Sequence, residues 1–146
     1  MRNSKLLFVC FWALSAIIIA VSGASAKEYT VEWFNNMNCF DQTYHNSNGY
    51  CTNLKIELTG MQGVQKKVYA TEEYKGQLGV QNSYTMKIST PKLAGACESM
   101  KLSASCTYNK FGTTVTETDS RTVSSCSSGK AIILINDFGV TFYPAK

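Results

Sequence analysis

The stretch of sequence that decides the fold reads Leu54-Lys55-Ile56-Glu57-Leu58-Thr59. Apolar residues occupy every second position and polar residues fill the positions between them. This is the pattern of a β-strand with one buried side and one solvent-facing side. A helix would instead repeat its apolar residues every three or four positions. The stretch therefore predicts a half-buried β-strand.

The same alternation recurs along the chain between clusters of Gly, Asn and Ser, which favour turns. One such segment, Asn109-Lys110-Phe111-Gly112, predicts a tight hairpin turn. Further strands are predicted at residues 28–34, 66–73, 84–90, 100–108, 113–123, 131–135 and 138–143. Seven or eight short antiparallel strands predict an all-β fold, namely a single-domain sandwich of two sheets held by disulfides. A small closed β-barrel is the alternative.

Two of these strands carry a prediction about their place in a sheet. The strand at 113–123 has five threonines and little apolar content. It is expected at an edge, where Glu117, Asp119 and Arg121 would oppose pairing with another strand. The uninterrupted apolar run at 131–135 predicts a central strand that is buried on both faces.

The first 26 residues predict a cleavable signal peptide. Arg2 and Lys5 precede an uncharged run at 6–21, and Ala24-Ser25-Ala26 matches the small-residue pattern that a signal peptidase accepts. The run is shorter than the roughly 20 residues that a permanent membrane helix needs. Cleavage would leave a secreted, extracellular domain at 27–146 with no membrane span.

Cleavage would also leave the chain nearly neutral. Without Arg2 and Lys5, 12 of the 14 basic residues remain against 10 acidic residues. Arg121 is then the single arginine, whereas proteins that bind nucleic acids usually cluster Lys and Arg against the phosphates. We therefore expect no nucleic-acid partner.

The mature chain keeps five cysteines, which are expected to pair in an oxidising compartment and leave one over. The local spacing favours a Cys39–Cys51 bridge that closes the polar loop between them. Cys97 and Cys126 are predicted to pair because they lie at the open ends of two hairpin strands. Cys106 is then the odd thiol, either buried and free or bridged to another molecule.

The candidates for catalysis are few. His45 is the only histidine, which excludes hydrolases that use two histidines and metal sites built from several. Asp41 shares a loop with His45, and a serine elsewhere would be needed to complete a triad. No nucleophile signature, metal-ligand spacing or cofactor motif accompanies them. We therefore expect a protein that is not an enzyme, and a hydrolase using His45 is the third hypothesis.

An asparagine-rich loop with aromatic neighbours predicts a contact surface, because rigid aromatic rings and adaptable Asn, Ser and Gly groups are typical of recognition surfaces. The candidate binding residues are Trp33, Phe40, Asp41, Tyr44, His45 and Tyr50. Trp33 is equally expected in a core, as an aromatic residue within a strand.

The leading functional hypothesis is a secreted, non-enzymatic binding protein that presents loops to an extracellular protein or glycan. An effector or toxin that acts on another organism is one form of this hypothesis. The alternative is an extracellular carrier that holds a lipid or other apolar small molecule between the two sheets.

Overall fold

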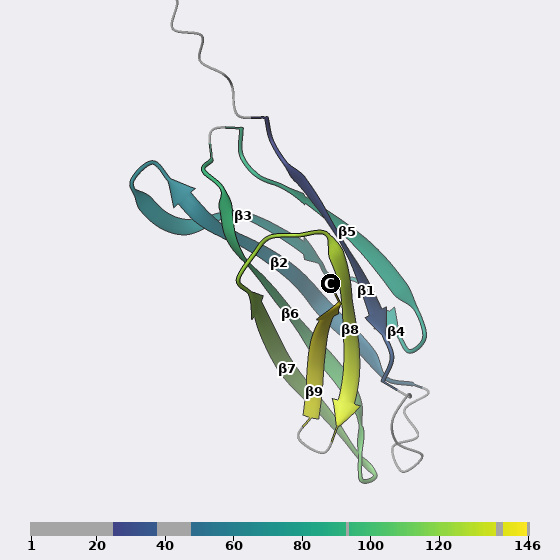
Figure 1. Ribbon diagram of the computed structural model, residues 1–146. Helices are drawn as coiled ribbons and strands as arrows, with labels where there is room; N and C mark the ends of the chain where they lie inside the picture. Colours follow the sequence, from purple (N-terminus) through teal and green to yellow (C-terminus); the bar gives the residue numbers. More distant parts are fainter. Residues whose placement is uncertain (1–24, 38–47, 93, 137–138, 146) are drawn as a thin grey trace, which may run out of the picture.

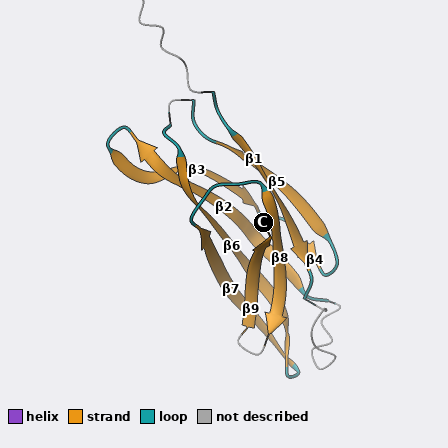
Figure 2. Ribbon diagram, in the orientation of Figure 1, coloured by secondary structure: helices purple, strands orange, loops and turns teal. Residues whose placement is uncertain are grey.

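The computed structural model describes residues 25–37, 48–92, 94–136 and 139–145, and their strands form two sheets packed face to face (Figures 1 and 2). Sheet A has the order β5 (Ser83–Ser89), β1 (Glu28–Asn35), β8 (Gly129–Asn136), β9 (Gly139–Ala145). Sheet B has the order β3 (Gln65–Tyr74), β2 (Tyr50–Gln62), β6 (Cys97–Lys110), β7 (Thr113–Val123), and the two-residue β4 (Leu78–Gly79) pairs with the start of β2. The predicted two-sheet sandwich is confirmed, and the described strands do not close into a barrel.

The alternation in β2 places its side chains as the sequence predicts. Leu54, Ile56 and Leu58 are fully buried on the side that faces sheet A. Lys55 and Glu57 lie on the opposite side, where Lys55 Nζ and Glu57 Oε1 are 2.9 Å apart. At the two sides of the sandwich, β3 lies against β5 and β7 lies against β9.

One strand pair departs from the antiparallel expectation. β1 runs antiparallel to β5 but parallel to β8, with Val31 beside Gly129 and Asn35 beside Ile133. The chain reaches β8 after crossing from sheet B to sheet A, so β8 does not follow β1 through a hairpin. Pairing between strands so far apart in sequence leaves no local signal.

β8 is a central strand, as predicted, since it lies between β1 and β9. Its expected burial on both faces is wrong. Ala131 and Ile133 are fully buried between the sheets, whereas Ile132 and Leu134 are half-buried on the outer side of sheet A. The apolar run therefore alternates in burial, although its sequence does not show it.

The predicted hairpin and edge strand are both present. Phe111 and Gly112 join β6 to β7 with positive φ angles of 52° and 82°, and two positive angles in succession suit the twist of a two-residue hairpin turn. Asn109 Oδ1 accepts a hydrogen bond from the Gly112 N–H at 2.8 Å. β7 lies at the edge of sheet B.

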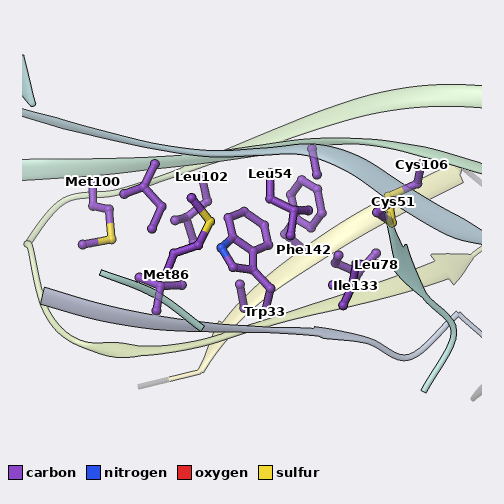
Figure 3. Close-up of a cluster of buried hydrophobic side chains, with 14 of the residues drawn as sticks. Trp33, Cys51, Leu54, Leu78, Met86, Met100, Leu102, Cys106, Ile133 and Phe142 are labelled. Carbon is purple, nitrogen blue, oxygen red and sulfur yellow. A yellow bond between two sulfur atoms is a disulfide. The ribbon is translucent and has the colours of Figure 1, made fainter. Parts of the chain in front are cut away.

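Trp33 and Phe142 form the centre of the hydrophobic core (Figure 3). Their ring centroids are 5.8 Å apart and their planes meet at 87°, so the edge of one ring faces the other. Trp33 comes from β1 and is fully buried. Its proposed role as a binding residue is therefore wrong, because an alternating strand directs it toward sheet B.

The disulfide between the two central strands of sheet B, β2 and β6, differs from the prediction. Cys51 bonds to Cys106, and their Cα atoms are 4.0 Å apart. The expected Cys39–Cys51 bridge and the free Cys106 thiol are both wrong. The two residues lie opposite each other in the register of β2 and β6 on the inner face. Cys39 lies outside the described residues.

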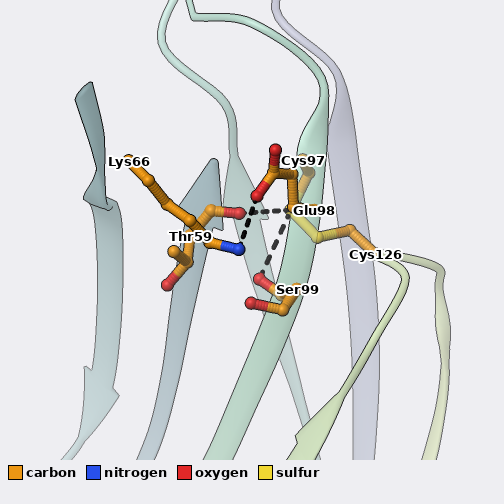
Figure 4. A network of polar contacts seen from close by, with 6 residues as sticks. All are labelled: Thr59, Lys66, Cys97, Glu98, Ser99 and Cys126. Carbon is orange, nitrogen blue, oxygen red and sulfur yellow. Dashed lines mark hydrogen bonds and ion pairs between the residues drawn. A yellow bond between two sulfur atoms is a disulfide. The ribbon is translucent and has the colours of Figure 1, made fainter. Parts of the chain in front are cut away.

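The second disulfide joins Cys97 to Cys126, with a Cα separation of 5.6 Å, and this is the pairing expected from the sequence. It ties the start of β6 to the crossing between β7 and β8 (Figure 4). Beside it, Lys66 Nζ and Glu98 Oε2 form an ion pair at 2.6 Å. Both side chains are well exposed, so this pair contributes about 0–1 kcal/mol.

A buried amide joins the two sheets at the end of β1. Asn35 is fully buried. Its Nδ2 donates a hydrogen bond to the Leu78 carbonyl at 2.9 Å, and its Oδ1 accepts one from the Met37 N–H at 3.2 Å. Since Leu78 belongs to β4 and thus to sheet B, the Asn35 side chain links β1 of sheet A to the opposite sheet.

Replacing Asn35 with Ala is expected to lower the free energy of unfolding by roughly 2–4 kcal/mol, because the Leu78 carbonyl and the Met37 N–H would lose their buried partner. Asn36→Ala is the matched control. It removes an exposed hydrogen bond from Gln81 Nε2 and is expected to cost about 0.5 kcal/mol or less. Urea unfolding followed by Trp33 fluorescence measures both variants, and equal losses would contradict this role of Asn35.

Candidate functional site

A groove of about 290 Å³ lies at the end of the sandwich that holds the β6–β7 turn. The described residues that line it are Asn48, Gly49, Tyr50, Thr107, Tyr108, Asn109 and Thr114. They come from the start of β2 and the segment before it, from the end of β6, and from the start of β7. Two regions that are distant in sequence, residues 48–50 and the hairpin residues 107–114, therefore meet at this groove.

The alternation that builds the core also turns side chains toward the groove. Cys51 and Cys106 point inward and form a disulfide. Their sequence neighbours Tyr50 and Thr107 are paired in the register of β2 and β6 and therefore point outward. Thr114 is brought beside them by β7, where it pairs with Asn109 of β6.

β4 fixes the backbone along one wall of the groove. Tyr50 pairs with Gly79 of β4, and the Val80 N–H donates a hydrogen bond to the Gly49 carbonyl at 3.2 Å. β4 is in turn held by the Asn35 side chain through the Leu78 carbonyl. The buried amide thus positions the start of β2, and with it one side of the groove.

Some polar groups of the groove are engaged within the protein. Thr107 Oγ1 and Thr116 Oγ1 share a hydrogen bond at 2.8 Å. The Tyr108 hydroxyl donates to Glu117 Oε2 at 2.8 Å, and Lys110 Nζ lies 3.3 Å from Glu117 Oε1. These contacts order the wall of the groove and hold the Glu117 carboxylate.

Other polar groups of the groove are unpaired. Across the described part of the chain, the side chains of Asn48, Tyr50 and Thr114 have no hydrogen-bond partner. None of the described lining residues is charged. The groove therefore offers an amide, a phenol and a hydroxyl, each of which both donates and accepts hydrogen bonds.

The outer face of β6 and β7 continues from the groove as a row of hydroxyl side chains. Ser105 Oγ and Thr118 Oγ1 share a hydrogen bond at 2.8 Å, which repeats the Thr107–Thr116 contact one step further along the strands. Cross-strand hydroxyl pairs of this kind stabilise the sheet. Because these hydroxyls are paired with each other, they are less available to a ligand than the side chains of Asn48, Tyr50 and Thr114.

The sequence-predicted binding residues divide into three groups. Tyr50 lines the groove, whereas Trp33 belongs to the core. The remaining candidates, Phe40, Asp41, Tyr44 and His45, lie outside the described residues.

Sequence reasoning did not name the other described lining residues as binding residues, namely Asn48, Gly49, Thr107, Tyr108, Asn109 and Thr114. The alternating threonines of 113–123 were the available signal for Thr114. That signal indicated an edge strand, but the pairing of β2 with β6 was needed to place Thr114 near Tyr50.

The described residues show no arrangement of metal ligands. Among them, no group of three or more His, Cys, Asp or Glu side chains is placed to hold a metal ion. In the register of β2 and β3, Glu72 lies opposite Ile56 and Glu73 lies opposite Lys55. The two carboxylates therefore point to opposite faces of sheet B. In the same described ranges, no helix is long and apolar enough to cross a membrane.

Comparison with protein-family models, curated proteins and solved structures finds no match. The chemistry of the groove is therefore interpreted from its own side chains.

Tyr69 is a titratable group whose ionisation the fold changes. Burial raises the pKa of Tyr69 above its ordinary value of 10.0, and the nearby Tyr29 and Glu98 raise it further. Its hydroxyl is buried without a described partner, and its ring lies over Gly60, where a Cβ atom would overlap it. Tyr69 belongs to β3 and is not among the described residues that line the groove, so we assign it a structural role.

Tyr69→Phe is expected to change how stability depends on pH. Tyrosine is neutral when protonated, so a raised pKa in the folded state means that the unfolded chain ionises first. The contribution of the protonated Tyr69 hydroxyl to the free energy of unfolding is therefore fully present below pH 10. It is lost as the pH rises from 10 toward the raised pKa. Tyr69→Phe should reduce the fall in unfolding free energy above pH 10.

At pH 8 the same variant should leave the free energy of unfolding unchanged, or raise it by about 1 kcal/mol, because it removes an unpaired buried hydroxyl. Urea unfolding at pH 8, 10 and 11 measures both effects. An equally steep decline in the wild type and the variant would contradict the assignment.

Proposed function

We propose that this chain is a secreted, non-enzymatic binding protein whose groove at Tyr50 and Thr114 receives an extracellular partner. The observation that carries the proposal is a set of three uncharged polar side chains, Asn48, Tyr50 and Thr114, that line one groove without hydrogen-bond partners among the described residues. Polar groups placed in this way give orientation and specificity to a bound molecule.

The start of the folded domain supports export and cleavage after Ala26. Ser25 and Ala26 are exposed, and β1 begins at Glu28. The Lys27 N–H donates to Thr90 Oγ1 at 2.9 Å, and the Lys27 carbonyl accepts from the Thr90 N–H at 2.9 Å. The domain is thus tied down from Lys27 onward, and its two disulfides are compatible with an extracellular protein.

Expression of the whole chain in a secretory host is expected to release a protein that begins at Lys27 and carries two disulfides. Since Cys51, Cys97, Cys106 and Cys126 are all paired, alkylation without reduction should modify Cys39 and leave Cys106 unmodified. Intact mass and peptide mapping measure both results. Retention of residues 1–26, or alkylation of Cys106, would contradict this proposal.

Packing between the sheets favours the groove over the carrier hypothesis. The inward residues that would surround an apolar ligand are 0–4% exposed and pack against Trp33 and Phe142. A ligand held there would have to displace these side chains, at a cost of several kcal/mol. The carrier and the hydrolase using His45 stay as alternatives, and an effector or toxin is one form of the proposed binding protein.

A large side chain placed in the groove is expected to weaken the binding of a partner. Thr114→Arg places a long side chain at the groove, and Thr122→Arg makes the same change about 27 Å further along β7. Both variants and the wild type would be screened on arrays of extracellular proteins and of glycans. A partner should bind Thr114→Arg at least about tenfold more weakly, a loss of 1.4 kcal/mol, and bind Thr122→Arg as the wild type.

Equal binding of a partner to the wild type and to Thr114→Arg would place the contact elsewhere on the protein. An equal loss in both arginine variants would indicate a general effect of positive charge on this face. Either result would overturn the groove as the binding site.

A further inference from the structure

We infer that the groove selects a neutral oligosaccharide, an inference that rests on the proposed binding function. The described lining combines amides, hydroxyls and a tyrosine ring with no charged side chain. Three properties of the groove indicate the ligand class: its charge, the pairing of its backbone, and the hydrogen-bonding groups of its side chains.

Charge separates the ligand classes first. A phosphate, a sulfate or a carboxylate loses water on binding and needs a cation or several N–H donors in return. The nearest lysine of the same hairpin, Lys110, lies 3.3 Å from the carboxylate of Glu117. Its charge is therefore already compensated, and the groove has no free cation among the described residues to offer to an anion.

The backbone of β2 is already paired on both sides at the groove. Tyr50 pairs with Gly79 on one side and with Thr107 on the other, and Asn109 pairs with Thr114. A peptide that binds by extending a sheet needs a free strand edge. Tyr50 has no such edge, so recognition at Tyr50 depends on its side chain, which disfavours a peptide that extends β2 at the groove.

The unpaired side chains suit the hydroxyl groups of a sugar. Each sugar hydroxyl donates and accepts hydrogen bonds, as do the Asn48 amide, the Tyr50 phenol and the Thr114 hydroxyl. The Tyr50 ring also offers an apolar face for the C–H groups of a sugar ring. A groove of about 290 Å³ is at the lower limit for a ligand pocket, so it would hold a short segment of a longer chain.

The test is a titration of the secreted, isotope-labelled protein with neutral hexasaccharides of the malto-, cello-, chito- and manno- series, followed by two-dimensional NMR. A heparin-derived hexasaccharide is the charged comparison. We expect saturable shifts at Asn48, Tyr50, Asn109 and Thr114 with at least one neutral series, and weaker binding of the heparin hexasaccharide.

Conservative variants then test the side chains. Thr114→Val and Tyr50→Phe each remove one hydroxyl without a change of shape and should raise the Kd about fivefold, the effect of one net hydrogen bond. Thr122→Val removes a hydroxyl from the same face of β7 and should leave the Kd unchanged. Thermal unfolding of all three variants checks that the fold is retained.

The neutral-sugar inference is overturned if none of the four series gives saturable shifts at the groove, or if heparin hexasaccharide binds as tightly. It is also overturned if Thr114→Val and Thr122→Val affect the Kd equally. A protein partner that binds the wild type but not Thr114→Arg would leave the proposed binding function standing while the sugar inference fails. If the binding of every partner is unaffected by substitutions in the groove, the proposed binding function and the sugar inference are both wrong.

Discussion

The burial of one amide constrains much of this structure. Asn35 is fully buried, so both of its polar atoms need partners, and they find them in Leu78 and Met37. Satisfying the amide brings β4 against the end of β1 and so ties sheet B to sheet A. Through β4, the same requirement fixes the backbone at Gly49 and Tyr50. A hydrogen-bonding requirement inside the sandwich thus shapes the groove on its surface.

Alternation connects the interior of sheet B to its outer face. Where β2 and β6 pair, one residue of each strand turns inward and forms a covalent bond, while its neighbour turns outward to the groove. A shift of one residue in this register would exchange the two sides and expose Cys51 and Cys106. The disulfide therefore fixes the register on which the position of Tyr50 beside Thr107 depends.

The features of the fold that depend on neighbouring residues could be predicted from the sequence. Alternation located the strands, and Asn109 to Gly112 indicated the hairpin because that turn is built from local dihedral angles. Features that depend on distant pairing were not predictable. The Cys51–Cys106 bond, the parallel β1–β8 pair and the meeting of Tyr50 with Thr114 all require a strand order that no local pattern contains. Trp33 shows a further limit, since an aromatic residue in a strand has the same local pattern in a core as on a surface.

The position of β1 in sheet A has a consequence for when the chain is able to fold. The Thr30 N–H donates a hydrogen bond to Ser128 Oγ, although the two residues are 98 positions apart. Sheet A therefore cannot be completed around β1 until β8, which follows Ser128 in the chain, has been synthesised. Pairing over such separations is slow, because the chain must first lose the entropy of a long loop. Sheet A is expected to stay open in the nascent chain until β8 has been synthesised, and an open chain is the state that a polypeptide needs if it is to pass through a narrow translocation channel.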